Sequence, residues 1–490
     1  MTDEAPLWTF LAGLRAAAIG PASQKNAAAL ILDHLTCAIV GMNLPWTRAV
    51  RSMYAELDAF RPGSGGATPP AVPAYLGPAS RYGDDRPLAT TTAALVNATA
   101  GHGLDLDDLY LPAMTHPGAI VIPAAIAVAE ATGARGLDLV TAVVAGYECM
   151  GRVGRAVGIR NVDHGFHATG QQGPLGSAVA AGRLLGFDAA QLENAVGLAV
   201  SLGGGIKAFT AGPGMVKRLH AGRAAEAGIL AAHGTLHGLA GPRRPLTSTF
   251  GFVPVFALAD PDLGGTARPE ALTERLGESW IVDDIYLKPY AACGALHGAI
   301  VAAEQVKAAL DAAGFVATPA TVAAVVVGSS RRTVAQNSNP DPGDVMSAQY
   351  SAEYAVALAL QGRVRDASRF LAVEADLSGQ HEDEDVRTLA RRTEVRVDDR
   401  AQAAYPDSNE GRVTVTLTDG REFSCYGGAD AAKSQGWAVA EAKFRQTAAA
   451  LVGAAAADDV VAGVRSLLAD GDIGAVLTPL RGRLDVGVAV

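Results

Sequence analysis

Residues 26–41 read NAAALILDHLTCAIVG, and this stretch sets the pattern for most of the chain. Alanine and leucine recur at helical spacing here, and again in TTTAALVNATAGHGLD (90–105) and LDLVTAVVAGYECMGRVGRAVG (137–158). The pattern predicts a bundle of helices up to about residue 280. Because small residues are abundant inside these runs, we expect the helices to approach one another closely, with glycine-rich joints such as AFTAGPGMVK (208–217) between them.

The last two fifths of the chain carry a second pattern. β-Branched residues alternate with others in TVAAVVVGSS (321–330), TEVRVDD (393–399) and GRVTVTLTDGREFSCYGG (411–428), and the last of these contains a turn-forming Asp419-Gly420 pair. From about Ala432 the sequence returns to helical spacing. These segments predict strands within a mixed α/β region, followed by helices that rejoin the first bundle.

We therefore expect a mainly α protein of two domains. The large all-helical domain comprises residues 1–283 and 431–490, and the smaller α/β domain, residues 284–430, is inserted into it. A length of 490 residues exceeds the size at which one core usually stops growing, and both predicted domains have ample apolar residues.

Composition narrows the classes of partner. The net charge of −10 gives no general reason to bind nucleic acid or an anionic membrane. Four widely spaced cysteines without a CxxC pair argue against a disulfide framework, a zinc ribbon and a typical iron–sulfur cluster. The acidic N-terminus lacks the features of a signal peptide, and the apolar stretches are too short to span a bilayer. We expect a cytoplasmic protein.

The densest group of candidate catalytic residues is GHGLDLDDLYLPAMTHPG (101–118). His102, Asp105 and Asp108 fall three residues apart, on one face if a helix reaches that far, and His116 follows outside a helix interior, before a proline. A carboxylate that orients an imidazole is a common general acid/base arrangement. The alternative is a helix N-cap followed by a solvated acidic turn.

Two glycine-flanked segments supply further histidines and cations. In NVDHGFHATG (161–170), His164 and His167 are as typical of a structural loop as of catalysis, and no further zinc ligands stand at interpretable spacing. In GMVKRLHAG (214–222), Lys217 lies with Arg218 and His220 in the first turns of a predicted helix, where free N–H groups and cations bind carboxylates; the alternative is a solvated basic patch.

The predicted domain junction contains the remaining candidates. Pro289 keeps Lys288 out of helical conformation, at a place where clefts tend to form. Cys293 follows, and a buried structural thiol is the more frequent role for such a residue. Tyr350 and Tyr354 stand at helical spacing, which is more typical of a core than of catalysis. The sequence contains no dinucleotide-binding glycine turn, Walker motif or serine-hydrolase elbow.

Taken in order, GHGLDLDD…HPG, HGFH…GPLGSA, GMVKRLHAGRAA, LKPYAACGALHG and AQYSAEYAVA resemble the MmgE/PrpD family across nearly the whole chain. The resemblance implies a helical domain containing both termini, an α/β lid domain, a homodimer, and an active site between the domains without metal or cofactor. It also implies the site residues Asp105, His116, His167, Lys217, Lys288 and Tyr354. Our hypothesis for their roles is that His116 and His167 act as proton donor and acceptor and that Asp105 fixes an imidazole.

The same resemblance implies proton transfer on a small di- or tricarboxylate. A hydro-lyase similar to 2-methylcitrate dehydratase is favoured, and an epimerase of an imino- or amino-dicarboxylate or a decarboxylase of cis-aconitate is the alternative. Leu109 stands where many members have a threonine, and Cys293 stands near the place of a histidine in vertebrate-type decarboxylases. These departures also keep open a non-catalytic protein that binds polycarboxylates.

Overall fold

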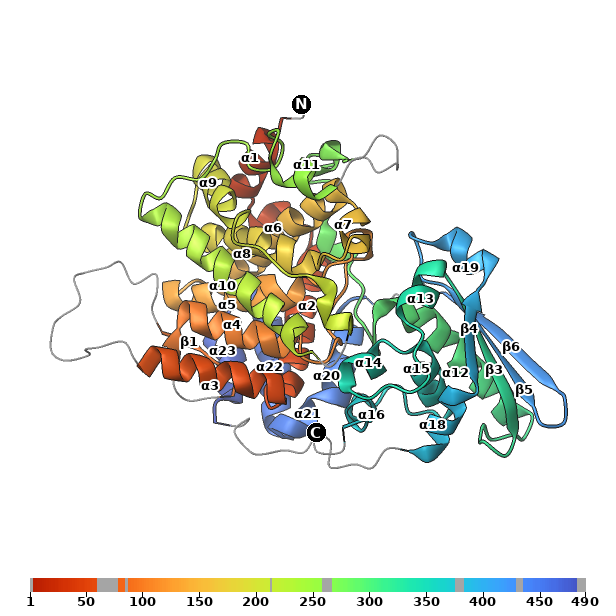
Figure 1. Ribbon diagram of the computed structural model, residues 1–490. Coiled ribbons are helices and arrows are strands. Elements are labelled where there is room, and N and C mark those ends of the chain that lie inside the picture. Colours follow the sequence, from red (N-terminus) through yellow and green to blue (C-terminus); the bar gives the residue numbers. More distant parts are fainter. Residues whose placement is uncertain are drawn as a thin grey trace.

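The structure, a computed structural model, describes residues 3–59, 78–83, 87–211, 214–257, 267–374, 383–428 and 435–482. A large helical body lies beside a smaller part in which helices pack on a mixed sheet (Figure 1). The predicted mainly α fold with a smaller α/β portion is confirmed.

The helical body is built from both ends of the chain (Figure 1). Its helices are α1 (Ala5–Gly13), α2 (Pro21–Gly41), α3 (Pro45–Ala59), α4 (Thr90–Gly101), α5 (Gly118–Thr132), α6 (Gly136–Val157), α7 (Arg160–Asp163), α8 (Ala168–Leu184), α9 (Ala189–Ala199), α10 (Val216–Leu236), α11 (Phe252–Ala257), α20 (Trp437–Thr447), α21 (Ala449–Val452), α22 (Ala454–Ser466) and α23 (Gly474–Leu477). A short hairpin of β1 (Pro78–Ser80) and β2 (Pro87–Ala89) precedes α4.

Helix α8 lies at the centre of this body, between α6 and α10. Gly146 of α6 and Gly176 of α8 face each other so closely that a Cβ on either would lie 2.9–3.0 Å from the other's carbonyl oxygen. A Cβ on Gly228 of α10 would lie 2.4 Å from the side chain of Ser177 of α8. The small residues are therefore needed for packing, which confirms the expectation that these helices approach closely.

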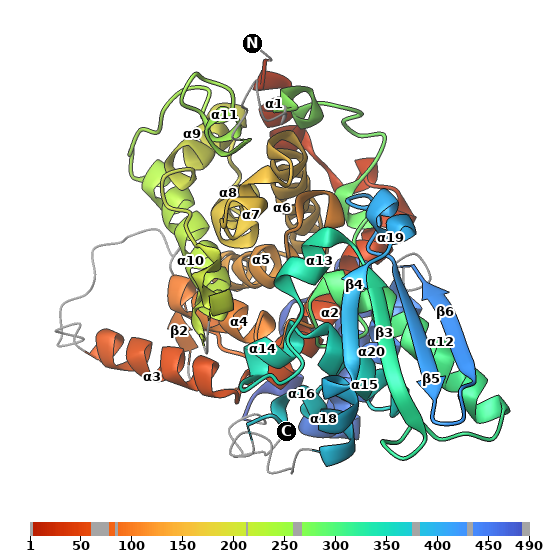
Figure 2. The same cartoon turned by 45° about the vertical axis from the view of Figure 1, so that its right-hand side comes forward.

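The α/β part contains a four-stranded sheet in the order β4-β3-β5-β6 (Figure 2). Strand β3 (Val322–Ser329) pairs in parallel with β4 (Thr393–Val397) and antiparallel with β5 (Gly411–Leu417), which pairs antiparallel with β6 (Glu422–Gly427). The β5–β6 turn contains the predicted Asp419-Gly420 pair, with Gly420 at φ 89°.

Helix α12 (His297–Ala312) packs against β5 and β6. The other helices of the α/β part are α13 (Arg331–Gln336), α14 (Val345–Gln349), α15 (Ala352–Leu360), α16 (Ser368–Leu371), α18 (Glu384–Arg391) and α19 (Asp399–Ala404).

Beyond the sheet the chain returns to the helical body, where α20 packs against α2 (Figure 1). Lys443 of α20 donates hydrogen bonds to Asp33 of α2 at 2.6 Å and to the carbonyl of Leu106 at 2.7 Å. All three residues are buried. The C-terminal helices therefore hold the loop that follows α4. The predicted boundary at residues 430 and 431 lies outside the described residues.

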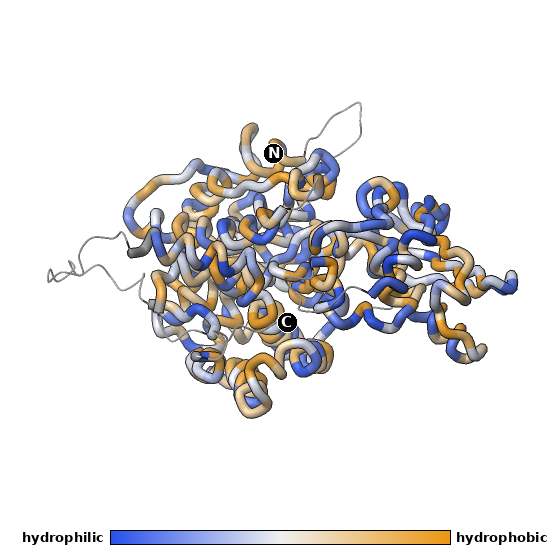
Figure 3. Tube along the Cα trace, turned by 60° about the horizontal axis from the view of Figure 1, so that its bottom comes forward, coloured by the Kyte–Doolittle hydropathy of each residue, from blue (hydrophilic) through white to orange (hydrophobic). Residues whose placement is uncertain are grey.

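Hydrophobic and hydrophilic residues are interleaved along the helices of both parts (Figure 3). Among the described helices, none is by itself both long enough and apolar enough to cross a membrane. Helix α2 and residues Pro45–Glu56 meet that test only together, as a pair bent by 86°.

Three buried histidines make stability depend on pH. Burial lowers the pKa of His34 to about 3, of His102 to about 4 and of His297 to about 3. In the unfolded chain these rings bind protons near pH 6.5, so between that pH and about 4 the unfolded state holds more protons. We predict that the free energy of unfolding, measured in urea, falls as the pH drops from 7 to 5. His34→Gln should lose about 2 kcal/mol less than the unaltered chain over this range; an equal loss would contradict the assignment.

Candidate active site

A pocket of about 110 Å³ lies where the helical body meets the α/β part. The side chains facing it come from several segments that are distant in the sequence. Residues from the helical body include Asp105, His116, His167, Lys207, Phe209 and Lys217, and residues from the junction and the α/β part include Cys293, Arg332, Asn337, Tyr350, Tyr405 and Asn409.

The loop between α4 and α5 carries the acidic run. His102, Asp105 and Asp108 would share a face only if a helix reached that far, and it does not: α4 ends at Gly101, and Asp105 adopts the left-handed region, with φ 54°. Such a conformation is strained for a residue other than glycine and needs outside support. Lys288 provides it by donating to the Asp105 carbonyl. A pair of backbone hydrogen bonds at 2.9 Å between Leu109 and Tyr286 holds the far end of the loop.

Asp105 is the partner of two buried lysines. Its Oδ1 lies 3.0 Å from Nζ of Lys217, in the first turn of α10, and 2.8 Å from Nζ of Lys288. Burial disfavours the charged carboxylate, but the two ammonium groups outweigh it and hold the pKa of Asp105 well below its usual range. The alternative of a solvated basic patch around Lys217 is wrong, because this side chain is buried. Two cations face one carboxylate, which leaves positive charge for an anionic ligand.

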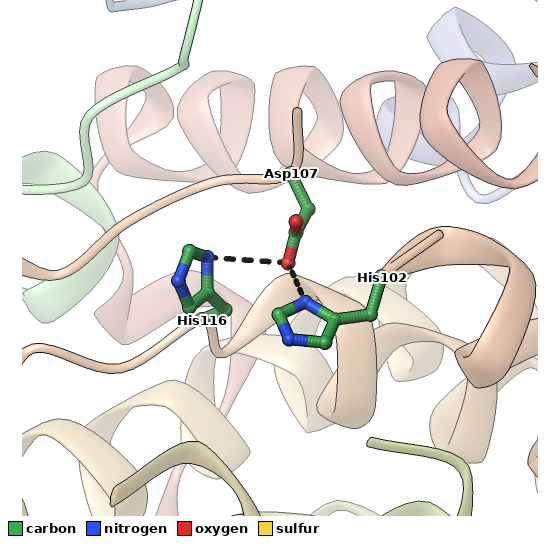
Figure 4. A group of neighbouring side chains, drawn as sticks. All are labelled: His102, Asp107 and His116. Carbon is green, nitrogen blue, oxygen red and sulfur yellow. Dashed lines mark hydrogen bonds and ion pairs between the residues drawn. The ribbon is translucent and has the colours of Figure 1, made fainter. Parts of the chain in front are cut away.

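Asp107, rather than Asp105, is the main partner of the imidazoles (Figure 4). Its Oδ2 lies 2.7 Å from Nδ1 of His102 and 3.2 Å from Nδ1 of His116, whereas Asp105 Oδ1 lies 4.0 Å from Nε2 of His116. Burial opposes ionisation of Asp107, yet His102 and His116 hold its pKa well below the usual range. The expectation that Asp105 fixes an imidazole is thus corrected, because adjacent backbone turns direct the two carboxylates to different partners.

Asp108 has a structural role. Its Oδ1 accepts a hydrogen bond from the backbone N–H of Gly118, the first residue of α5, at 2.9 Å, and its Oδ2 accepts one from the hydroxyl of Tyr147 at 2.7 Å. Burial raises the pKa of Asp108 to about 7. Asp108 thus binds a free N–H at the start of the next helix, although the N-cap residue of α5 is Pro117. The alternative of an N-cap followed by a solvated acidic turn is wrong, because the acids of this run are buried.

The two predicted catalytic histidines both face the pocket. His116 precedes Pro117 at the start of α5, and His167 directly precedes α8. His167 also stacks on His102, with ring centroids 5.8 Å apart. Of the two loop histidines, His164 is exposed and contacts the carbonyl of Arg160 at 3.2 Å.

The structure places Tyr354 in the core instead of the pocket. Its ring packs against Phe370, with centroids 6.2 Å apart, and its hydroxyl donates to the carbonyl of Arg369 at 3.2 Å. Tyr350, which caps the end of α14 just before α15 begins, lines the pocket, and Nζ of Lys217 lies 5.3 Å from the centroid of its ring. The residue chosen from the family motif is corrected to Tyr350. Cys293 also lines the pocket and is half-buried, contrary to its interpretation as a buried structural thiol.

Two further cations were not recognised from the sequence. Lys207 begins the short 3₁₀ segment Lys207–Ala211 and donates to Gln336 at 2.9 Å. Arg332, on α13, contacts Asp163 at 3.0 Å and donates to the hydroxyl of Tyr405 at 2.6 Å. Both cations line the pocket. No local motif marks them, since each reaches the pocket only through the meeting of the two parts of the fold.

The three side chains of Figure 4 are of types that bind metal ions. One ligand-type atom from each of His102, Asp107 and His116 lies within 4.8 Å of the others. However, the 2.7 Å between His102 Nδ1 and Asp107 Oδ2 is a hydrogen-bond distance, whereas tetrahedral ligands bonded at about 2.0–2.1 Å lie roughly 3.3 Å apart. With Lys217 and Lys288 adding positive charge nearby, the trio is best described as an acid/base group, in which Asp107 is hydrogen-bonded to His102 and lies within ion-pair distance of His116.

Comparison with known proteins agrees with this arrangement of segments. The model of the MmgE/PrpD N-terminal domain matches residues 6–263, and that of the MmgE/PrpD C-terminal domain matches residues 290–466. The chain belongs to the MmgE/PrpD family. The two matched regions carry the two sides of the pocket.

Among individual relatives of this MmgE/PrpD protein, a cis-aconitate decarboxylase of Aspergillus terreus is 30% identical over 295 residues, which are 58% of this chain and 56% of that protein. A cis-aconitate decarboxylase of Homo sapiens is 35% identical over 227 residues, 45% of each chain. The chain thus matches about half the length of these relatives.

The role of Asp107 can be tested without a substrate. We predict that Asp107→Asn lowers the pKa of His102 below its value of about 4, because Asp107 is the main group that offsets the effect of burial on this ring. A titration of the histidine ¹⁵N resonances measures this. Asp108→Asn is the control, since the Asp108 carboxyl binds Gly118 and Tyr147 instead. An unchanged midpoint in Asp107→Asn would show that this carboxylate is not the partner.

Proposed function

We propose that this protein is a carboxy-lyase that removes carbon dioxide from cis-aconitate or a closely similar tricarboxylate. The observation that carries the proposal is a single pocket in which His116 and His167 face cations from three segments, namely Lys217, Lys207 and Arg332. The names of the matched relatives support this reaction over the dehydration favoured by the family resemblance.

The chemistry needs an acid and fixed positive charge. In cis-aconitate, the bond between the methylene carbon and its carboxylate breaks, and its electron pair forms a new double bond. The electrons of the old double bond take a proton at the far carbon, so one proton is consumed for each carbon dioxide released. Negative charge builds up on the remaining carboxylates during this step and is stabilised by prearranged cations.

The residues of the pocket match these needs. His116 and His167 are the candidate proton donors, and a protonated His116 has carboxylates near both ring nitrogens. Lys217 holds one carboxylate of the substrate. Asp105 neutralises only part of the charge of Lys217, because Asp105 also pairs with Lys288. Lys207 and Arg332 hold another. Apolar side chains complete the wall and suit the departure of neutral carbon dioxide: Leu109, Leu111, Met114, Val162 and Phe209.

His116→Ala tests the acid. We predict release of carbon dioxide from cis-aconitate by the purified protein and a fall in kcat of about 10² to 10⁴-fold in the variant, the usual contribution of a general acid. His164→Ala, which changes an exposed histidine, should retain full activity. Near-normal turnover by His116→Ala would exclude this residue, and the absence of carbon dioxide release from the unaltered protein would overturn the proposed reaction.

Arg332→Gln tests the second carboxylate site. Loss of a charge-assisted hydrogen bond weakens binding by about 1.5–3 kcal/mol, so we expect KM for cis-aconitate to rise about tenfold or more. Arg331→Gln removes the same charge from an exposed position on the same helix and should leave KM unchanged. Equal KM values in the two variants would show that Arg332 does not bind substrate.

A further inference from the structure

His167 has a second histidine as its partner. A hydrogen bond of 3.0 Å joins Nδ1 of His167 to Nδ1 of His220, which lies on α10, three residues after Lys217. One imidazole must donate and the other accept, so a single proton lies between the two rings. Because Nδ1 of His167 is occupied in this way, Nε2 is the nitrogen that remains for a ligand in the pocket.

The surroundings hold this pair in place. The ring of Phe209 packs edge-on against both imidazoles, at 5.4 Å from His167 and 6.1 Å from His220. The carbonyl of Gly205 accepts a hydrogen bond from the backbone N–H of His167 at 3.0 Å, and a Cβ on this glycine would lie 2.9 Å from Nδ1 of His220. The glycine thus binds one histidine and leaves room for the other.

The two histidines differ in their access to the pocket and to solvent. His167 is buried and faces the pocket, whereas His220 is half-buried and is not among the described residues that line it. Any effect of His220 on a bound substrate therefore acts through His167. His116 and His102 have Asp107 as a common partner, and His220 takes the corresponding position beside His167.

We propose that His220 is a positioning residue for His167. It accepts a hydrogen bond from Nδ1–H of His167, and it shares the positive charge when His167 takes up a second proton, at Nε2, for transfer to the substrate. This inference rests on the proposed lyase function. In this arrangement a neutral imidazole orients the donor histidine, as a carboxylate does in many acid/base pairs.

The proton count is balanced. In the resting pair, His167 carries its proton on Nδ1 and His220 carries one on Nε2. A proton taken up from water at Nε2 of His167 gives a cation, and its charge spreads to His220 through the shared Nδ1 proton. Transfer of the Nε2 proton to the substrate carbon returns the pair to its neutral form. In each cycle the pair thus takes up one proton and transfers one proton, which matches the single proton that each decarboxylation consumes.

The electrostatic surroundings explain why sharing is needed. Burial lowers the pKa of His167 well below its usual range, and His102, Lys217, His220 and His116 oppose its protonation further. Burial, followed by Lys217, also lowers the pKa of His220, although this ring is nearer to solvent. Spreading the charge over two rings, one of them half-buried, reduces the cost of forming the cation. The two rings should then titrate as a pair.

Chemical rescue separates this role from simple packing. We expect His220→Ala to lower kcat on cis-aconitate about 10 to 100-fold with KM changed by less than about twofold, and to move the basic limb of the kcat–pH profile to lower pH, because the donor loses its partner. Added imidazole should fill the half-buried space and restore at least a third of kcat in a saturable manner. His164→Ala should show neither the loss nor the response to imidazole.

His220→Asn is the second variant, in case His220→Ala does not fold. The side-chain oxygen of asparagine can accept a hydrogen bond from Nδ1–H of His167, but asparagine cannot share the positive charge of a protonated His167. It should keep the fold and KM and still show the shifted pH limb. The inference is overturned if His220→Ala or His220→Asn has the kcat and pH profile of the unaltered protein, or if imidazole restores no activity to a folded His220→Ala.

A measurement without substrate separates this inference from the proposed reaction. In ¹H–¹⁵N spectra, the shared Nδ1 proton should give a far-downfield resonance that disappears in His220→Ala and persists in His164→Ala. Its presence in a protein that does not act on cis-aconitate would leave the histidine pair intact and refute only the reaction. Its absence from the unaltered protein would refute the pair.

Discussion

The carboxylate of Asp105, held between Lys217 and Lys288, is the interaction on which the site depends. It joins the loop after α4, the start of α10 and the junction with the α/β part, three segments that are far apart in the sequence. Removing one partner from a buried ionic group costs about 3–5 kcal/mol, because the remaining charges lose their compensation. The cluster keeps an excess of positive charge, which a substrate carboxylate can neutralise. Stability and binding therefore rest on the same three side chains.

This constraint also explains the division of labour in the acidic run. Beyond the end of α4 the chain runs through turns and bends, with Asp105 held in the left-handed region, and successive carboxylates point to different neighbours. Asp107 meets His102 and His116, and Asp108 meets the start of α5. Lys443 holds the carbonyl of Leu106 between the two functional acids. The C-terminal helices thereby contribute to the site without entering it.

Much of this was predictable from local patterns. Helical spacing and small residues are local properties, and they located the helical body and its close packing, while the β-branched alternation located β3, β4 and β5. Glycine and proline also mark chain ends near helices, which is why His116, His167, Lys217 and Lys288 were each singled out as candidates. The family resemblance then grouped them into one site, in which Lys288 pairs with Asp105 rather than lining the pocket. The exchange of Asp107 for Asp105 was not predictable, because it depends on where a helix ends. The helical spacing around Tyr354 did indicate its core position, which the family motif overrode, but it gave no sign that Tyr350 faces the pocket. Lys207 and Arg332 depend on the docking of two parts of the fold, for which a single segment holds no signal.

The proposed reaction requires that a histidine of the pocket, His116 or His167, delivers a proton to carbon while a carboxylate departs. Turnover of cis-aconitate in deuterated water tests it most directly, with the product analysed by mass spectrometry and the released carbon dioxide measured in parallel. We predict one deuteron bound to carbon in each product molecule and one carbon dioxide for each substrate consumed. A product that carries no carbon-bound deuterium, or label incorporated into cis-aconitate without loss of carbon dioxide, would contradict the claim.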